Sequence, residues 1–509
     1  MKKILYRFIL SLLFSHFLLF ISIGQPLHQK KEFTHADTLR GTITPERAWW
    51  DVTHYNLQVS FNFNKRSIAG YNIISYKIVS APAKEMQVDL QAGLDIDSVI
   101  YENKSLSFRR DGNAYFVAVP SAANKAKTQM IAVYYHGIPR PALHPPWDGG
   151  VIWSKDEKGN PWISVACQGL GASVWYPCKD HQSDEPDSAS LSMIVPDTLT
   201  AIANGRLRNE MNNGDGTATY TWAVTNPINN YNITPYIGKY AHWHEDYDGE
   251  KGKLDCDFWV MEYNVDKAKV QFKQALQMLH CFEHWFGPYP FYEDGYKLIE
   301  APHLGMEHQS AVAYGNGFAN GYKGTDLSGT GWGLKWDFII VHESGHEWFG
   351  NSITTKDVAD MWVHEGFTNY SETIFTTCEY GKEAGNDYVI GTRKRIQNDK
   401  PIQGPYGVNQ EGSGDMYYKG GNLVHTIRQI INNDSSFRML LRGMNKTFYH
   451  QTVTGKQIEE YISKTSGIDF SKVFDQYVRT TQIPVLEYKV KGNKLSYRWT
   501  NCVKGFNMP

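Results

Sequence analysis

Cysteine is scarce in this chain, and none of it is arranged as a cysteine-based metal motif. The six cysteines among 509 residues are Cys167, Cys178, Cys256, Cys281, Cys378 and Cys502. No two of them form a C-x-x-C pair. Disulfide pairing cannot be read from their spacing, and buried free thiols are the favoured interpretation.

Long runs of one charge sign are also missing. The chain has 51 Lys and Arg against 53 Asp and Glu, a formal net charge of −2. The basic residues are dispersed, with no tract beyond short pairs such as Lys30-Lys31, so nucleic-acid binding is not expected. Internal repeats and low-complexity tracts are absent, and an aromatic content of 14% is typical of a large folded enzyme.

Only one stretch is apolar enough to suggest export or a membrane anchor. Residues 9–23 are mostly apolar, follow a basic start and end at a small-x-small site, Ser22 and Gly24. This pattern predicts a cleaved signal peptide at 1–24, because the run is short for the alternative, an uncleaved anchor. No cysteine precedes Cys167, which excludes a lipid on an N-terminal cysteine. We therefore expect a periplasmic or extracellular protein without a stable membrane anchor.

The hydrophobic period changes once along the chain and separates a β domain from a helical one. Residues 55–63 and 218–224 alternate with period two, as strands of an antiparallel sheet do. Helical patterns then dominate, as at residues 267–286, which stop at Gly287-Pro288.

A multidomain α+β chain is therefore predicted. Its segments are a signal peptide at 1–24, a polar, poorly ordered leader at 25–45, an N-terminal β domain at 46–262, a mainly α zinc domain at 263–482 and the start of a third β domain at 483–509. In the last segment two short strands flank Gly492-Asn493, which is a hairpin signal. Two strands make no stable layer alone, so they either pack on another domain or begin one that is cut short at Pro509.

The most informative motif is His342-Glu343-Ser344-Gly345-His346, which spells H-E-x-x-H. Residues 335–349 have the apolar spacing of a helix, in which positions i and i+4 lie on one side, about 6 Å apart along the axis. His342 and His346 can therefore chelate one metal ion. Glu343 lies roughly 100° around the helix from His342, where it can face a water without ligating the metal.

A third ligand is predicted from the next helical segment. Residues 361–375, which Asp357 or Asp360 can cap, carry Glu365. Two His and one Glu leave a coordination position open for water, as in catalytic zinc sites, whereas a structural site is closed by four ligands, usually with Cys. The nearest cysteine in sequence is Cys378. We therefore expect one catalytic Zn²⁺ rather than a satisfied pair of core histidines.

These residues resemble the zinc segment of the aminopeptidase N and leukotriene-hydrolase family, peptidase family M1. That family carries H-E-x-x-H-x-W-F-G and then W-x-N-E-G-F, and residues 342–350 and 362–367 follow this pattern. Three further segments agree in order, so the resemblance covers roughly residues 50–500. L-G-M-E-H at 304–308 resembles the exopeptidase motif G-A-M-E-N, Y-Y-K-G at 417–420 resembles Y-x-K-G, and Gln168 with W-Y-P-C-K-D at 175–180 resembles the part of the N-terminal domain that reaches the active site.

The resemblance implies a thermolysin-like, mainly α catalytic domain behind the β domain. In many members a small β-sandwich and a helical C-terminal domain that covers the site follow, and only the opening strands of such a sandwich are present here. The chain departs from the family pattern at Leu304, Gly305, His308, Glu347 and His364. The departures in the exopeptidase motif and before Glu365 concern substrate preference more than chemistry.

The catalytic roles follow from what peptide hydrolysis needs. Zinc lowers the pKa of a bound water to about 7 and polarises the carbonyl. Glu343 is expected to take the proton of the water and pass it to the leaving amine. The resemblance implies that Tyr417 donates to the developing oxyanion, and the choice over Tyr418 rests on the family register. The alternative for Glu343 is a solvated helix carboxylate, and the alternative for Tyr417 is an ordinary core or surface tyrosine.

The resemblance also implies a site for the free amine of the substrate. Glu307 would pair with the α-ammonium and Gln168 would accept a second hydrogen bond from it. Gly305 and Met306 would line the bound substrate, and His303 is a candidate contact for its first side chain. The alternative for Glu307 is a charge at a strand edge.

These residues predict a zinc aminopeptidase whose partners are peptides with a free N-terminus. The alternatives are an endopeptidase or an epoxide hydrolase on the same scaffold, and a non-catalytic peptide-binding module. The presence of Glu343 and of all three ligands argues against the last alternative.

Overall fold

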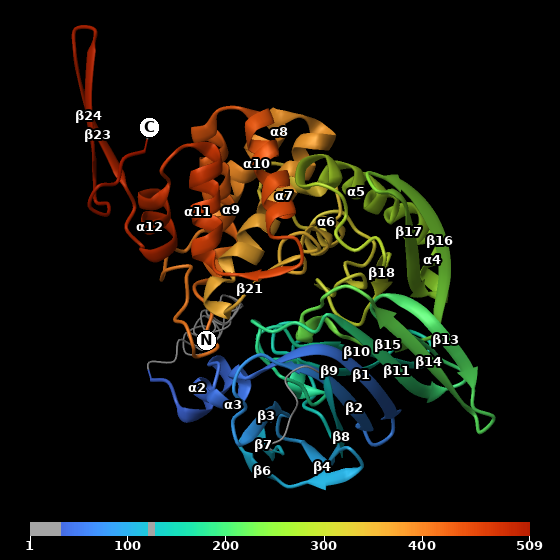
Figure 1. Ribbon diagram of the computed structural model, residues 1–509. Helices are drawn as coiled ribbons and strands as arrows, with labels where there is room; N and C mark the ends of the chain where they lie inside the picture. The colour runs from blue at the N-terminus through green and yellow to red at the C-terminus, as the bar shows by residue number, and fades with distance from the viewer. Residues whose placement is uncertain (1–31, 121–127, 509) are drawn as a thin grey trace, which may run out of the picture. The chain divides into compact units, whose positions relative to one another are not determined.

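The computed structural model describes residues 32–120 and 128–508. The predicted signal peptide at 1–24 and the start of the predicted leader lie outside the described residues. The later part of the leader is ordered rather than poorly ordered, because it forms helix α2 (His35–Gly41), and α3 (Pro45–Ala48) follows it. Figure 1 colours the N-terminal strands blue to green and the helices of the second half from green through yellow to red.

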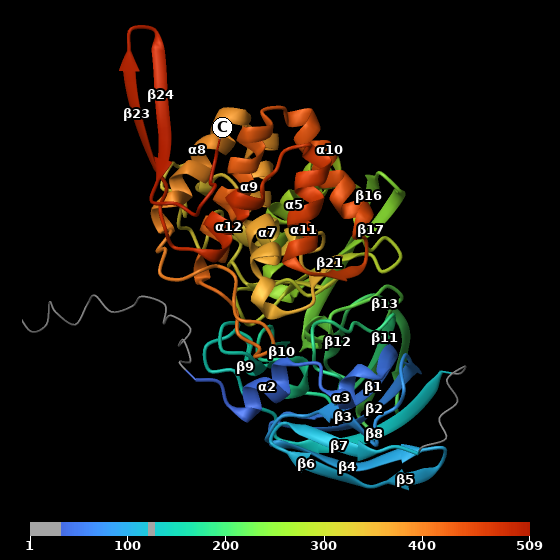
Figure 2. The same ribbon diagram turned by 60° about the vertical axis from the view of Figure 1, so that its left-hand side comes forward.

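An eight-stranded sheet forms the body of the N-terminal part (Figures 1 and 2). In spatial order its strands are β13 (Arg206–Asn212), β14 (Thr217–Val224), β11 (Ser188–Pro196), β1 (Trp50–Asn62), β2 (Ser67–Ile78), β8 (Gln129–Gly137), β4 (Leu94–Tyr101) and β5 (Lys104–Leu106). All neighbours are antiparallel except β1 and β11. Alternate side chains of β1 are buried from Tyr55 to Phe61, as the period-two pattern predicts.

Two smaller sheets complete the β part. One contains β12 (Thr200–Ile202), β15 (Tyr236–Gly238), β10 (Pro161–Ala166) and β9 (Gly150–Lys155), and the other contains β3 (Glu85–Asp89), β7 (Ala114–Ala118) and β6 (Phe108–Asp111). The sheets share one hydrophobic core, in which Tyr76 packs edge-on against Trp49 and Trp50. Aromatic side chains supply much of the buried area in this core.

A five-stranded sheet crosses the predicted boundary between residues 262 and 263. Its order is β16 (Tyr240–Gly249), β17 (Gly252–Met261), β18 (Tyr296–Glu300), β20 (Val312–Tyr314) and β19 (Gly305–Met306). Strand β17 runs parallel to β18, so residues assigned to the β domain by sequence pair with strands of the zinc domain. The short strand β19 places the exopeptidase motif at the sheet edge.

Helices form most of the second half of the chain. They are α4 (Val265–Gln271), α5 (Lys273–Phe286), α6 (Phe338–Gly345), α7 (Trp362–Tyr380), α8 (Lys382–Thr392), α9 (Tyr418–Ile431), α10 (Asp434–Thr447), α11 (Gly455–Ser466) and α12 (Ser471–Arg479), and β21 (Ile353–Thr355) pairs with β22 (Gln451–Val453) among them. The single helix predicted at 267–286 is two helices that meet at Phe272, whose ring packs on Tyr314 at 4.9 Å. The second of them ends at Gly287, where φ is 100°.

The helix that carries H-E-x-x-H is shorter than the predicted 335–349. It begins after Asp337, whose side chain accepts hydrogen bonds from the backbone N–H groups of Ile339 and Ile340. It ends at Gly345, so His346 is its C-cap residue and keeps a helical φ of −65°. The i, i+4 relation of the two histidines therefore survives although the helix is only eight residues long.

The β part and the helical part are joined by side-chain hydrogen bonds that are wholly or partly buried. The Asn229 amide donates to the Gly350 carbonyl at 2.7 Å, and the Asn204 amide donates to the Gln309 carbonyl at 2.7 Å. The Gln182 amide donates to Thr355 Oγ1 at 2.7 Å. These bonds fix the register between the two parts next to the metal-binding motif.

The C-terminal hairpin forms as predicted around Gly492-Asn493. Its strands are β23 (Val485–Lys491) and β24 (Lys494–Thr500), and every side chain of β23 is exposed. The assignment of this hairpin to a third β domain stays a prediction.

Two cysteines are paired, whereas the sequence favours buried free thiols and leaves the pairing open. Cys281 of α5 and Cys378 of α7 form a disulfide, while Cys167, Cys178 and Cys256 are buried free thiols and Cys502 is half-buried. Pairing depends on the approach of two helices 97 residues apart in sequence, which spacing alone does not reveal. Among the described residues no helix is long and apolar enough to cross a membrane.

Candidate active site

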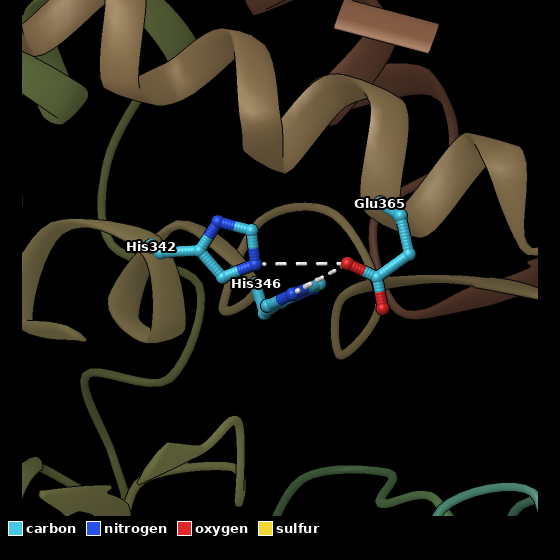
Figure 3. Close-up of side chains that lie close together, drawn as sticks. All are labelled: His342, His346 and Glu365. Carbon is cyan, nitrogen blue, oxygen red and sulfur yellow. Dashed lines mark ion pairs between the residues drawn. The ribbon is translucent and has the colours of Figure 1, made fainter. Parts of the chain in front are cut away.

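Close packing of two helices brings the predicted metal ligands together. A Cβ atom added to Gly345 of α6 would lie 2.5 Å from Ser371 Oγ of α7, so glycine permits this approach. As a result, His342 and His346 face Glu365, which lies in the first turn of α7 (Figure 3).

The three ligand side chains converge on one point. Glu365 Oε2 lies 3.6 Å from His342 Nε2 and 3.4 Å from His346 Nε2. All three residues are buried, and their ligand atoms lie within 4.8 Å of one another. A single ion between them can reach each atom at the 2.0–2.2 Å typical of zinc ligands.

The outer nitrogen of each imidazole is held by an acceptor. His342 Nδ1 lies 2.8 Å from Glu372 Oε1, and His346 Nδ1 lies 2.9 Å from the Phe349 carbonyl oxygen. Both rings therefore donate from Nδ1 and turn the Nε2 lone pair toward Glu365. Zinc-binding histidines are commonly oriented in this way, by a carboxylate or a carbonyl behind the ring.

The donor set fits zinc. Glu365 Oε2 is buried and has no hydrogen-bond partner among the described residues, although a buried carboxylate oxygen normally has one. Two imidazole nitrogens and one carboxylate oxygen form the ligand set of catalytic zinc sites with an open position. No cysteine takes part in this group.

Glu343 lies beside the ligands and is not one of the three. Its carboxylate, that of Glu307 and a His346 ring nitrogen also lie within 4.8 Å of one another. Burial and the nearby carboxylates of Glu307 and Glu365 raise the pKa of Glu343 to about 7, against the opposing effect of the imidazoles. A Cβ atom on Gly305 would lie 2.9 Å from Glu343 Oε1, so only glycine lets strand β19 run this close to the carboxylate.

Glu307 is a buried carboxylate that is held in place by two donors. The Gln168 amide donates to Glu307 Oε1 at 2.6 Å, and the Tyr231 hydroxyl donates to the same oxygen at 3.0 Å. Gln168 comes from the β part and Glu307 from the helical part, so these two predicted residues meet across the junction. Burial and the carboxylate of Glu365 raise the pKa of Glu307.

Tyr417 lies beside the ligands, at the start of helix α9. Its ring stacks on His342 with centroids 5.9 Å apart. A Cβ atom on Gly420 would lie 2.8 Å from Gly366 Cα, so a glycine pair lets α9 pack tightly against α7. Burial and the Glu365 carboxylate raise the pKa of Tyr417 well above its usual range, so the phenol keeps its proton.

The residues at which the chain departs from the family pattern are buried. His308 Nδ1 lies near the Tyr236 hydroxyl at 2.5 Å, and His364 Nε2 accepts from the Thr355 backbone N–H at 2.8 Å. Glu347 accepts from the Ser310 backbone N–H at 2.8 Å. These contacts give His308, His364 and Glu347 a structural role behind the ligands.

The other predicted substrate contacts are less exposed than the prediction implies. Met306 is 5% exposed and packs in the core of the β part, and His303 is 6% exposed with Nε2 3.2 Å from Ser164 Oγ. Their contact with substrate stays a prediction.

Two site residues escaped the sequence analysis. Glu372 lies seven residues after Glu365 on α7, so it is on the same face two turns later, and this spacing is a usable signal. Tyr231 reaches Glu307 from the β part, and nothing in its local sequence indicates the contact.

A second group with ligand-type side chains lies on the surface. His244, Asp246 and Asp255 are close enough together to hold an ion. Lys253 pairs with Asp246 at 2.8 Å, and Arg206 pairs with Asp255 at 2.5 Å. Protein cations already neutralise both carboxylates, so this group is a surface ion-pair network.

Two family models match the chain. The Peptidase M1 N-terminal domain matches residues 52–231, and the Peptidase family M1 domain matches residues 271–477. The chain belongs to peptidase family M1. Both matches follow the order of the β part and the helical part described above.

Characterised relatives of this M1 protein are distant. Aminopeptidase N of Lactococcus lactis subsp. lactis is 22% identical over 470 residues, which are 87% of this chain and 52% of the relative. Leukotriene A-4 hydrolase of Xenopus laevis is 20% identical over 446 residues, 82% of this chain and 68% of that protein. The chain spans about half the length of several curated relatives that it matches.

Solved structures show the same fold. An M1 zinc metallopeptidase from Deinococcus radiodurans has a TM-score of 0.73 at 19% identity, with 86% of this chain and 95% of that chain covered. A mutant M1 zinc metallopeptidase from Deinococcus radiodurans, bound to a Tyr-Ser-Ala substrate, also has a TM-score of 0.73. The order of a β domain and a helical zinc domain is therefore the family architecture.

Replacing Glu372 with Gln should weaken zinc binding by about 10- to 100-fold, because His342 loses the carboxylate that orients it. The measurement is zinc affinity by competition with a chelator. Glu379→Gln, on the exposed end of the same helix, is the matched control and should leave the affinity unchanged. Equal affinity in Glu372→Gln and the control would show that the carboxylate does not support the ligand.

Proposed function

We propose that the protein is an aminopeptidase that uses one zinc ion to remove N-terminal residues from peptides. The observation that carries this proposal is the position of Glu307. Its buried carboxylate is fixed by two donors and lies within 4.8 Å of groups on Glu343 and His346. An anionic group beside the reacting centre suits a substrate whose free ammonium is one residue from the bond to be cut.

A zinc ion held by His342, His346 and Glu365 would supply a Lewis acid for the carbonyl and an activated water. A single ion is proposed because the surface group at His244 already has its carboxylates paired with protein cations.

Protein groups carry out the proton transfers and stabilise the developing charge. The raised pKa of Glu343 makes it a stronger base than an ordinary glutamate, which suits removal of a proton from the attacking water and its transfer to the leaving amine. The protonated phenol of Tyr417 can donate to the oxyanion, a charge that is largest in the transition state.

The amine site can bind a substrate ammonium through two residues. Both protein donors to Glu307 use Oε1, so Oε2 is the oxygen available to an ammonium group. Because Gln168 donates its amide hydrogen to Glu307, its own carbonyl oxygen is free to accept from the same ammonium. Two protein acceptors that bind one charged amine would both stabilise the bound substrate and determine which peptide bond is cut.

The comparisons support a peptide substrate. Several relatives are named aminopeptidases, and neighbouring structures contain a Tyr-Ser-Ala substrate or an amino acid. The similarity to leukotriene A-4 hydrolase keeps an epoxide hydrolase as a second candidate. The fixed carboxylate at Glu307 favours an amine-bearing substrate over a neutral epoxide.

We also propose that the protein is exported to the periplasm or the extracellular space. The signal-peptide pattern at residues 1–24 motivates this, and the disulfide between Cys281 and Cys378 supports it, because disulfides persist mainly in oxidising compartments.

Replacing Glu343 with Gln should lower kcat by roughly 10²- to 10⁴-fold while one zinc per chain is retained, because the amide keeps the shape but cannot accept a proton. Turnover of an aminoacyl anilide and elemental analysis of the same sample provide both readouts. Glu383→Gln, in α8 away from the ligands, is the control. Wild-type turnover in Glu343→Gln would remove this residue as the base.

An N-acetylated aminoacyl anilide should be cleaved at least roughly 10-fold more slowly than the free amine, because the charged hydrogen bonds to Glu307 are lost. Glu307→Gln should slow cleavage of the free amine and narrow the difference between the two substrates. Equal cleavage of both by the wild-type protein would refute the exopeptidase assignment. Efficient cleavage within long N-blocked peptides would favour the endopeptidase.

The exported protein should begin at Gln25 and carry four free thiols, since two of its six cysteines are paired. Cell fractionation, N-terminal sequencing and thiol counting under denaturing, non-reducing conditions test this together. A cytosolic chain that begins at Met1 with six free thiols would contradict it.

A further inference from the structure

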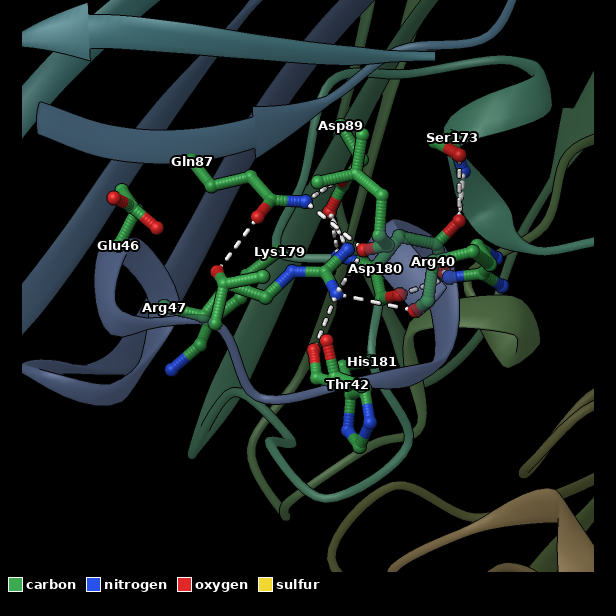
Figure 4. A network of polar contacts seen from close by, with 12 residues as sticks. Arg40, Thr42, Glu46, Arg47, Gln87, Asp89, Ser173, Lys179, Asp180 and His181 are labelled. Atoms are coloured by element: carbon green, nitrogen blue, oxygen red, sulfur yellow. Dashed lines mark hydrogen bonds and ion pairs between the residues drawn. The ribbon is translucent and has the colours of Figure 1, made fainter. Parts of the chain in front are cut away.

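A buried arginine anchors the segment of residues 36–48, which covers all of α2 except its first residue, the link and α3 (Figure 4). Arg47 has no exposed surface. Its Nη1 donates to the carbonyls of Leu39, Arg40 and Thr42 at 2.9–3.1 Å, and its Nη2 pairs with Asp89 at 2.6 Å. One guanidinium thus folds the segment on itself and fastens it to strand β3.

The network continues from Asp89 to residues 173–180, which follow the turn that carries Gln168. Asp89 Oδ2 also accepts from the Asp180 backbone N–H at 2.9 Å. The Asp180 carboxylate pairs with Arg40 at 3.1 Å and accepts from the Ser173 backbone N–H at 3.0 Å. Residues 173–180 are therefore held between Asp89 and Arg40.

The turn at residues 167–171 carries Gln168 and rests on the same segment. The Gly171 backbone N–H donates to the Cys167 carbonyl at 2.7 Å, which closes the turn. A Cβ atom on Gly171 would lie 2.1 Å from Arg40 Nη2, so the turn and the guanidinium are in direct contact. Arg40 therefore packs against the turn that carries Gln168.

The segment also touches the loop that precedes Tyr417. A Cβ atom on Gly41 would lie 2.2 Å from the Asn409 backbone nitrogen and 2.5 Å from that of Val408. The Asn409 side-chain amide in turn donates to the Gly169 carbonyl at 3.0 Å. Residues 36–48 therefore contact both the Gln168 turn and the loop at 408–409, which come from the β part and the helical part.

Burial of these charges is hard to explain by stability alone. Replacing a buried ion pair with apolar side chains of similar volume is often neutral or stabilising, whereas charged pairs fix one geometry. The geometry fixed here is that of the turn whose residue Gln168 bonds to Glu307 at 2.6 Å.

We propose that residues 36–48, through Arg47 and Arg40, are a positioning element for the amine-binding pair Gln168 and Glu307. This inference rests on the aminopeptidase function proposed above. Arg47 and Arg40 pair with Asp89 and Asp180 and not with a metal ligand, so loss of these pairs should weaken binding of the substrate amine and leave zinc binding and the chemical step in place.

Two variants disturb the segment in different ways. Arg47→Met removes the buried cation, and Gly41→Ala inserts a methyl group against the 408–409 loop without changing charge. The matched control is Arg109→Met, because Arg109 pairs with Glu85 at 2.7 Å in the same β part but is largely exposed. The measurements are kcat and KM for an aminoacyl anilide, zinc content, and hydrogen exchange of the full-length protein.

Both variants should raise KM about 10-fold or more while kcat changes little, the signature of lost binding shared by ground state and transition state. Amide exchange should quicken in peptides covering 167–180 and 405–412, with helix α7 and zinc content unchanged. Arg109→Met should match wild type in every measurement. Gly41→Ala keeps the test decisive if Arg47→Met fails to fold.

Unchanged KM and unchanged exchange in the two loops would overturn the proposal. Loss of zinc with faster exchange throughout α7 would overturn it too, since the segment would then be a general stability element. If the aminopeptidase function itself is wrong, the result differs from both of these outcomes, because the wild-type protein would not prefer a substrate with a free amine. The exchange measurement needs no substrate, so the loop contacts can be judged in that case as well.

Discussion

The buried carboxylate of Glu365 is the constraint on which the rest of the site depends. Its Oε2 faces two imidazole nitrogens at 3.4 and 3.6 Å and has no hydrogen-bond partner among the described residues. A buried carboxylate is costly without a compensating positive charge, and a metal ion at the point where the three groups meet would supply that charge. The glycine contact between α6 and α7 and the acceptors behind each histidine serve that convergence.

The metal ligands could be predicted because they depend on local geometry. His342 and His346 lie four residues apart in one helix, so their mutual position follows from the helical repeat whatever surrounds it. The predicted helix is too long, because α6 ends at Gly345. The predicted position of the two histidines is still correct, because His346 keeps helical dihedrals. Glu365 could be expected from its place on the next helical segment, whereas Tyr417 needed the family resemblance, because only the packing of α9 on α7 brings it to the histidines.

Features that depend on distant pairing were missed or misjudged. Strands β16 and β17 lie within the range predicted as the N-terminal β domain, yet their pairing with β18 joins them to the zinc domain. The disulfide between Cys281 and Cys378 and the bond from Tyr231 to Glu307 also link segments that are far apart in sequence. Periodicity reports which face of an element is buried, and it carries no information about the partner that buries it.

The distinction between local geometry and distant pairing also separates the metal ligands of this protein from its proposed amine site. The ligands and Glu343 lie on two adjacent helices of the helical part, so a single packing contact assembles them. The proposed amine site instead combines Gln168 and Tyr231 of the β part with Glu307 of the helical part. A shift between the parts would leave the ligands together and separate the amine-binding residues. In the proposed aminopeptidase, buried polar bonds at this junction, such as Asn229 to Gly350, would therefore affect where a peptide is cut more than whether it is cut.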